Sequence, residues 1–170
     1  MKIISHRGNI CGPNPSREND PQFIEEAIQL GFDVEIDLRI VDDEFHLGHD
    51  DPKSHYTFGC PYYKTSIEWL TSHKDKLWIH CKNLQALDIM SQSSENFNYF
   101  WHTTDLYTIT SHGIGWVYPG NYPYKKSIIV LPESISLYNK EFCGYEYIIN
   151  SYGICTDKPI FYKDELEVKQ

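Results

Sequence analysis

Short apolar runs that alternate with helical patterns constrain the fold of this chain more than any other feature. Strand-like runs cover Lys2–His6, Asp33–Ile40, Leu77–Lys82, Asn98–His102, Gly113–Tyr118, Ser127–Leu131 and Tyr152–Thr156. After the first run, Asp20-Pro21 provides a capping side chain followed by proline at the first helical position, and Gly31 ends the helical pattern. Strands that alternate with helices pair in parallel, so this order predicts an α/β fold.

A hairpin and further helices extend this order. Helical patterns also cover Ser66–Lys74, Leu84–Ser93 and Glu133–Glu141. Within Val41–Asp50 two adjacent aspartates favour a turn, so this stretch predicts a small hairpin that leaves the second strand. No repeat or linker divides the 170 residues, and we expect one domain over residues 1–170.

The charge and the cysteine content exclude several classes of protein. The net charge of −9 argues against a nucleic-acid partner, which needs a basic face, and against adhesion to anionic membranes. No apolar run suits a signal peptide or a membrane span, so we expect no stable membrane insertion. The cysteines are odd in number and lack Cys-x-x-Cys spacing, which favours a reducing compartment and a cytoplasmic location; they are Cys11, Cys60, Cys81, Cys143 and Cys155.

The strand Asp33–Ile40 carries two carboxylates where a buried face is expected. Alternation along DVEIDLRI puts its aliphatic residues on one face and Glu35 and Asp37 on the other. Both faces of a parallel sheet are normally covered, so neighbouring carboxylates there need a cation or a shared proton. An exposed sheet face is the alternative explanation.

Basic residues end the neighbouring strands. They are His6 and Arg7 after the first strand, His49 after the hairpin, and His80 and Lys82 on one face of LWIHCK. Each alone has a plainer explanation as a turn residue, a cap or an ion-pair partner. Together, two histidines, two carboxylates and cations suit phosphate-ester chemistry, in which cations neutralise phosphoryl oxygens and histidines move protons.

Several motifs, in a fixed order, resemble one known family. HRG (His6–Gly8), REND (Arg17–Asp20), AIQLGFDVEIDLR (Ala27–Arg39) and LGHD (Leu47–Asp50) are similar to the pattern of glycerophosphodiester phosphodiesterases, in the phospholipase-C-like phosphodiesterase superfamily. YGICTDKP (Tyr152–Pro159) is similar to the final barrel strand of that family. The resemblance implies a (β/α)8 TIM-type barrel with its site at the C-terminal ends of the strands. Such barrels typically need about 250 residues, so we expect a compacted barrel with reduced helices and an irregular or open C-terminal half.

The resemblance also implies catalytic and phosphate-binding roles for residues at matching positions. His6 and His49 correspond to a general acid/base pair, and Arg7 corresponds to a phosphate-binding residue. The resemblance further implies that Lys82 contacts the phosphate or the attacking hydroxyl. In the family a glycerol hydroxyl can attack the phosphorus to give a cyclic phosphate, so no protein nucleophile is needed.

One divalent metal ion is the cofactor that the resemblance implies. Glu35 and Asp37 are the implied ligands, and Glu18 lies in the same site as a further ligand or as support for Arg7. His80 stands where the family has a third glutamate, and it either ligates the ion or only bonds a neighbouring carboxylate. Mg²⁺ or Ca²⁺ is the first expectation, and an imidazole ligand also admits Mn²⁺ or Zn²⁺.

Aromatic residues near strand ends are candidates for the substrate pocket. Trp116 and Tyr118 are expected to line it, and Trp101 and His102 end a neighbouring strand. Core packing is the alternative for the tryptophans.

These expectations describe a metal-dependent phosphodiester hydrolase of lipid metabolism. Its partner would be a small glycerophosphodiester, such as a deacylated phospholipid head group. Two alternatives stay open: a degenerate barrel that binds a phosphorylated ligand without turnover, and a phospholipase-D-like lyase that acts on lysolipids.

Overall fold

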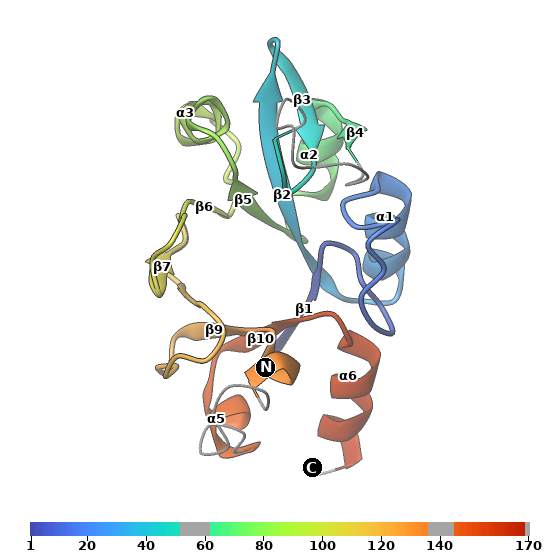
Figure 1. Ribbon diagram of the computed structural model, residues 1–170, viewed down its shortest axis with the longest axis vertical. Coiled ribbons are helices and arrows are strands. Elements are labelled where there is room, and N and C mark those ends of the chain that lie inside the picture. Colours follow the sequence, from blue (N-terminus) through green and yellow to red (C-terminus); the bar gives the residue numbers. More distant parts are fainter. Residues whose placement is uncertain (52–61, 136–144, 169–170) are drawn as a thin grey trace.

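The computed structural model describes residues 1–51, 62–135 and 145–168, and its strands form a curled sheet (Figure 1). The strands are β1 (Lys2–His6), β2 (Asp33–Val41), β3 (Glu44–Leu47), β4 (Tyr63–Lys64), β5 (Leu77–Cys81), β6 (Tyr99–Phe100), β7 (Tyr107–Ile109), β8 (Gly115–Val117), β9 (Ser127–Val130) and β10 (Gly153–Thr156). The helices are α1 (Pro21–Gln29), α2 (Ile67–His73), α3 (Leu84–Gln92), α4 (Pro132–Ile135), α5 (Tyr145–Asn150) and α6 (Pro159–Val168). The predicted α/β class is confirmed.

The strands pair in the order β6-β5-β2-β1-β10-β9-β8-β7. Every adjacent pair from β6 to β8 is parallel, whereas β7 is antiparallel to β8. The far end of β2 continues into the predicted hairpin with β3, and β3 pairs with β4. Four adjacent strands, β5, β2, β1 and β10, therefore end side by side.

Side chains on the two faces of the sheet form separate cores. The aliphatic residues Val34, Ile36 and Leu38 of β2 are fully buried against α1, α2 and α3. The other face points into the interior of the curl, where a second cluster includes Trp78 and Trp116. The alternation predicted for β2 is confirmed, and it leaves Glu35 and Asp37 on the interior face.

Local capping signals place the helix starts. Asp20 caps α1, because its side chain accepts a hydrogen bond from the Gln22 amide at 3.0 Å, and Pro21 follows at the first helical position. Ser66 caps α2 and Asn83 caps α3 in the same way. Such caps satisfy amides that the first helical turn cannot pair.

The barrel that the resemblance implies is present only in reduced form. Residues 101–126, all of which the structure describes, contain no helix, so β6, β8 and β9 are joined by loops and the antiparallel strand β7. Among the described residues, β6 and β7 form no strand ladder with each other. Single hydrogen bonds bridge the two segments instead. The Thr108 hydroxyl donates to the Trp101 carbonyl at 2.9 Å, and Ser111, just after β7, bonds Tyr99 through its backbone amide and its hydroxyl. The expectation of a compacted barrel with reduced helices and an irregular or open C-terminal half is therefore confirmed for the described residues.

Several segments differ from or lie beyond the sequence prediction. β6 is shorter than the predicted Asn98–His102, since the Trp101 carbonyl accepts from the Thr108 side chain of β7 rather than from a backbone amide. The sequence did not predict β7, α5 or α6. Of the predicted helix Glu133–Glu141, only the part up to residue 135 lies within the described residues, where it belongs to α4. Two of the cysteines, Cys60 and Cys143, lie outside the described residues. No helix of the described residues is long and apolar enough to cross a membrane.

Candidate active site

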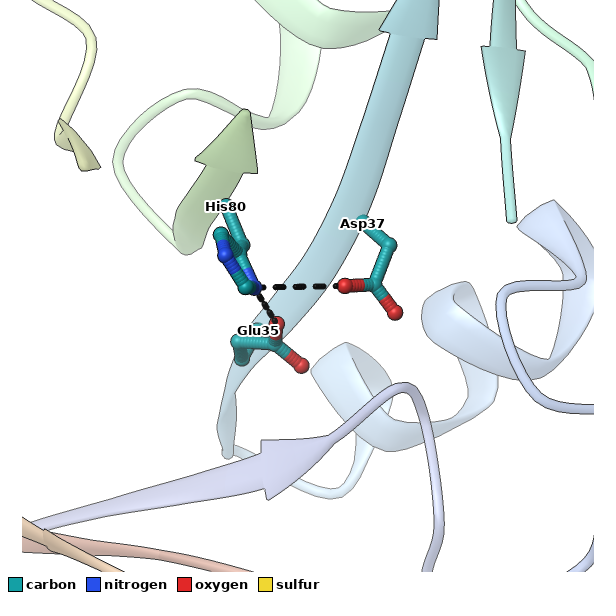
Figure 2. Close-up of side chains that lie close together, drawn as sticks. All are labelled: Glu35, Asp37 and His80. Atoms are coloured by element: carbon teal, nitrogen blue, oxygen red, sulfur yellow. Dashed lines mark ion pairs between the residues drawn. The ribbon is translucent and has the colours of Figure 1, made fainter. Parts of the chain in front are cut away.

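Three buried side chains from two adjacent strands form a candidate metal centre (Figure 2). Glu35 and Asp37 come from β2, and His80 comes from β5, where it is the register partner of Asp37. His80 Nδ1 lies 3.3 Å from Asp37 Oδ1 and 3.8 Å from Glu35 Oε1. The three potential ligand atoms lie within 4.8 Å of one another. Parallel pairing of β2 and β5 brings these residues together, because their ladder aligns them at the same level.

The two carboxylates of this centre have opposite pKa shifts. Burial and the adjacent charge of Asp37 raise the pKa of Glu35. Burial alone would raise the pKa of Asp37 too, but Arg7, His80 and Lys82 outweigh it and hold that pKa well below its usual range. Asp37 is therefore the firmly ionised member, because two cationic side chains lie beside it.

The donor set fits a divalent cation. Glu35 is 3% exposed and Asp37 is 0% exposed, and their atoms Oε2 and Oδ1 are buried without a hydrogen-bond partner. A buried carboxylate oxygen without a donor is costly unless a cation neutralises it. The two carboxylates and the imidazole could supply three ligands to one ion.

The turn after β1 directs Arg7 into this centre. Arg7 and Gly8 have φ values of 54° and 87°, so the chain turns through the left-handed region there. Gly8 also lies against α1: an added Cβ would be 3.2 Å from the backbone nitrogen of Ile24. Arg7 Nε lies 2.8 Å from Asp37 Oδ2 as a result. The HRG segment is thus a tight turn that buries a guanidinium beside a carboxylate.

Glu18 supports Arg7 in this structure. Its carboxylate accepts a hydrogen bond from Arg7 Nη1 at 2.9 Å and another from the Asn9 amide at 3.1 Å. Glu18 is not a member of the three-residue cluster, and its ion pair is with Arg7.

His6 is paired with an aspartate that sequence reasoning missed. His6 Nδ1 lies 2.7 Å from Asp157 Oδ1, and His6 Nε2 lies 4.0 Å from Glu35 Oε2. Burial alone would lower the pKa of His6, but the bond to Asp157 and the charge of Glu35 outweigh it and raise that pKa. Asp157 follows β10, whose pairing with β1 brings residues 151 positions apart into contact. The Glu133 carboxylate in turn accepts a hydrogen bond from the backbone amide of Asp157 at 2.8 Å.

His49 lies at the end of the hairpin, closer to solvent than His6. Its side chain is 44% exposed and bonds Asp50 at 2.7 Å, and partial burial lowers the pKa of His49. Arg39 fixes the backbone here, because its guanidinium donates to the carbonyls of His49 at 2.7 Å and Lys82 at 3.3 Å. Lys82 Nζ lies 3.7 Å from Asp37 Oδ1, so the same contacts place both His49 and Lys82 beside the centre.

These side chains line one cavity of about 650 Å³ with two unlike walls. The polar wall carries the candidate catalytic and binding residues His6, Arg7, Glu35, Arg39, His49, His80 and Lys82. The rest of the lining is mainly apolar and aromatic, and it includes Trp101, His102, Trp116, Tyr118, Val130 and Leu131. Trp116 is 4% exposed and also packs in the interior core, whereas Tyr118 is 49% exposed. The cavity thus joins a cationic, carboxylate-rich surface to an aromatic one.

Two asparagines also escaped sequence reasoning. The Asn19 side chain donates to Asp37 Oδ2 at 3.1 Å and accepts from the Asp37 amide at 2.9 Å. Asn9 donates to both Glu18 and Asp157. Asparagine in a loop usually indicates a turn, and no spacing in the sequence distinguishes these two from turn residues. For Asp157 a signal existed, since it follows a buried strand in the way that His6 does.

Comparison with solved structures shows what the fold resembles. The structure matches a glycerophosphoryl diester phosphodiesterase from Parabacteroides distasonis with a TM-score of 0.56 and 16% identity, over 98% of this chain and 86% of that one. It also matches a protein from Galdieria sulphuraria, provisionally assigned as a glycerophosphodiester phosphodiesterase, with a TM-score of 0.52 and 12% identity, over 98% of this chain and 97% of that one. No family model and no curated protein matches the sequence. The chain therefore has the TIM-type fold of glycerophosphodiester phosphodiesterases over nearly its whole length, in a reduced form and at low sequence identity.

Proposed function

We propose that this chain is a metal-dependent phosphodiester hydrolase that acts on glycerophosphodiesters. One observation carries the proposal: the imidazoles of His6 and His49 line the same cavity as the Glu35–Asp37–His80 centre and its neighbouring cations. Two proton-transfer groups beside a candidate ion site are what cleavage of a phosphate diester requires.

Phosphate binding falls to the polar wall of the cavity. Arg7 and Lys82 both lie beside Asp37, and their charges would hold the phosphoryl oxygens there. Glu18 keeps the Arg7 guanidinium in place through its hydrogen bond. A divalent ion held by the centre would add Lewis-acid neutralisation of the same oxygens.

The two histidines move the protons of the reaction. One imidazole takes the proton from the glycerol hydroxyl as its oxygen forms a bond to phosphorus, and the other gives a proton to the alcohol oxygen as its bond to phosphorus breaks. The product is a cyclic phosphate, which water then opens with the proton transfers reversed. Asp157 holds the His6 ring at Nδ1, so Nε2 is left to exchange the proton. No serine or cysteine nucleophile takes part.

The aromatic wall would receive the organic part of the substrate. Trp116 and Tyr118 line the same cavity as the charged residues, so a diester with its phosphate at Arg7 would have its alcohol group within the same cavity as these rings. These two residues are therefore our candidates for selecting the leaving alcohol.

Turnover of a simple diester tests this function. Glycerophosphocholine is incubated with the chain and Mg²⁺, Ca²⁺, Mn²⁺ or Zn²⁺, and loss of the diester and formation of glycerol phosphate and any cyclic phosphate are followed by phosphorus NMR. We expect activity in the wild type, a loss of about 10²- to 10⁴-fold in His6→Ala and in His49→Ala, and no loss in His112→Ala. His112 is an exposed histidine that does not line the cavity and serves as the matched control. Equal rates in all four proteins would refute the proposal.

A second candidate function is binding of a phosphorylated ligand without turnover. The shortened C-terminal half favours it, as does His80, which stands in the centre where the resemblance implies a third carboxylate. Saturable binding of glycerol phosphate, with no product under any of the four metals, would replace the first proposal by this one.

A further inference from the structure

We infer that the Glu35–Asp37–His80 centre selects a late first-row divalent ion of the Zn²⁺ type over Mg²⁺ and Ca²⁺, bound through His80 Nδ1. The inference rests on the proposed function, because it names the kind of metal that the same site uses. Its basis is the hydrogen bonding and ring packing of His80, which are independent of any substrate.

The hydrogen bond of His80 decides which ring nitrogen can bind a metal. His80 Nε2 lies 3.3 Å from the backbone carbonyl oxygen of His102. A carbonyl oxygen only accepts, so Nε2 carries a hydrogen. A ring that ligates a metal ion is neutral, so in that state its lone pair is on Nδ1. That atom faces Asp37 Oδ1 and Glu35 Oε1, as Figure 2 shows. Histidine ligands of metals commonly donate their other ring N–H to a carbonyl in this manner.

Packing holds the His80 ring in this orientation. Its centroid lies 4.8 Å from that of Phe100 and 4.5 Å from that of His102, with interplanar angles of 15° and 10°. Both partners come from β6 and the residues directly after it, and Phe100 is the register partner of His80. Turning the ring by 180° would put a carbon atom in the place of Nδ1 and break the bond to the His102 carbonyl. The nitrogen donor is therefore oriented toward the carboxylates before any ion arrives.

A nitrogen donor changes which ions the centre prefers. Mg²⁺ and Ca²⁺ favour oxygen ligands, whereas imidazole suits Zn²⁺ and the neighbouring late transition ions. A neutral imidazole also carries no negative charge, so it adds nothing to the Coulombic attraction on which hard cations depend. Arg7 and Lys82 lie beside Asp37 and reduce that attraction further. Both effects weaken Mg²⁺ and Ca²⁺ relative to Zn²⁺.

The inference is tested by metal binding rather than by turnover. Zn²⁺, Mg²⁺ and Ca²⁺ are titrated separately by calorimetry into the full chain and into His80→Glu, His80→Gln and His112→Gln. Co²⁺ serves as a spectroscopic probe, because its visible absorption reports nitrogen ligation. His80→Gln keeps an uncharged polar side chain and is used should His80→Glu not fold.

We expect wild type and His112→Gln to bind Zn²⁺ alike, with Mg²⁺ and Ca²⁺ at least about 100-fold weaker. His80→Gln should lose about 100-fold or more in Zn²⁺ affinity and should change the Co²⁺ spectrum. His80→Glu should narrow or reverse the difference between the affinities for Zn²⁺ and Mg²⁺.

Three outcomes would overturn the inference. They are Mg²⁺ affinity equal to that for Zn²⁺ in the wild type, a Co²⁺ spectrum unchanged by His80→Gln, and a loss in His112→Gln as large as in His80→Gln. Failure of the proposed function is a separate result. Selective Zn²⁺ binding without turnover of glycerophosphocholine refutes the hydrolase and leaves the metal preference standing, whereas turnover with Mg²⁺ that His80→Glu leaves unchanged does the reverse.

Discussion

The two halves of the sheet contribute unequally to the candidate site. In the N-terminal half β2 is nine residues long, and helices cover its outer face. In the C-terminal half β6 has two residues and β8 has three, and loops join them to their neighbours. The charged residues come almost entirely from the first half, and the aromatic wall comes from the second. Side chains that need fixed mutual geometry thus lie where the strand ladders are longest.

The charged network of the first half should show the largest effect. Arg7→Met leaves the fully buried Asp37 without its guanidinium, and we expect the free energy of unfolding to fall by about 3–5 kcal/mol. Denaturant unfolding measures this. The double variant Arg7→Met/Asp37→Asn should recover most of the stability without recovering activity. A double variant as unstable as the single one would mean that charge burial is not the cause.

Matched isoleucines in the outer cores compare the packing of the two halves. Ile36 and Ile154 are both fully buried on parallel strands, but Ile36 lies in the extensive core under three helices and Ile154 lies in a small cluster near α5 and α6. We expect Ile36→Ala to lower the free energy of unfolding by about 4 kcal/mol and Ile154→Ala by about 2 kcal/mol. The difference arises because the smaller cluster can relax into the space that the truncated side chain leaves. Thermal and denaturant unfolding of both variants give the comparison. Equal losses would show that the halves are packed alike.

Asp157 is the place where the second half acts on the candidate chemistry. Its bond raises the pKa of His6, since the aspartate stabilises the protonated ring. Asp157→Asn should therefore lower the pKa of His6, which NMR titration of the imidazole measures. Asp50→Asn, at the other histidine, is the control and should leave the pKa of His6 in place. An unchanged His6 pKa in Asp157→Asn would mean that burial and Glu35 alone set it.

The aromatic wall should show the smallest effect. Tyr118 is half exposed, lines the cavity and carries no charge, so Tyr118→Ala should raise KM about 5-fold and leave kcat nearly unchanged. Steady-state kinetics with two diesters that differ in their alcohol group separates the two constants. A large fall in kcat would place Tyr118 among the groups that act on the phosphorus.

Sequence reasoning succeeded where the signal is local. Alternation along β2 predicted which side chains face the interior, and the Asp20-Pro21 pair predicted where α1 starts, because both depend on a few consecutive residues. The antiparallel strand β7 was missed, because Tyr107 and Ile109 are exposed and show no pattern of burial.

Contacts between distant segments were the part that could not be predicted. The bond from His6 to Asp157 exists because β10 pairs with β1. The sequence of neither strand indicates which strand it will pair with. Asn19 bonds Asp37 from a left-handed turn with φ of 65°, and asparagine is common at such turns whether or not it supports a site. Which ring nitrogen of His80 faces the metal centre likewise depends on a hydrogen bond to the His102 backbone carbonyl. A backbone contact of this kind cannot be predicted from residue types.

β6 and β7 form no strand ladder among the described residues, and this seam between them bears on how a barrel fold can be shortened. The residues of the charged centre come from adjacent ladders that share continuous backbone pairing, and none of that pairing passes through the seam. The alignment of the reactive groups therefore depends only on the pairing of each strand with its neighbour, and it does not require a closed barrel. Shortening or grafting the connection between β6 and β8 should consequently alter which molecules are admitted and leave the alignment beneath them intact.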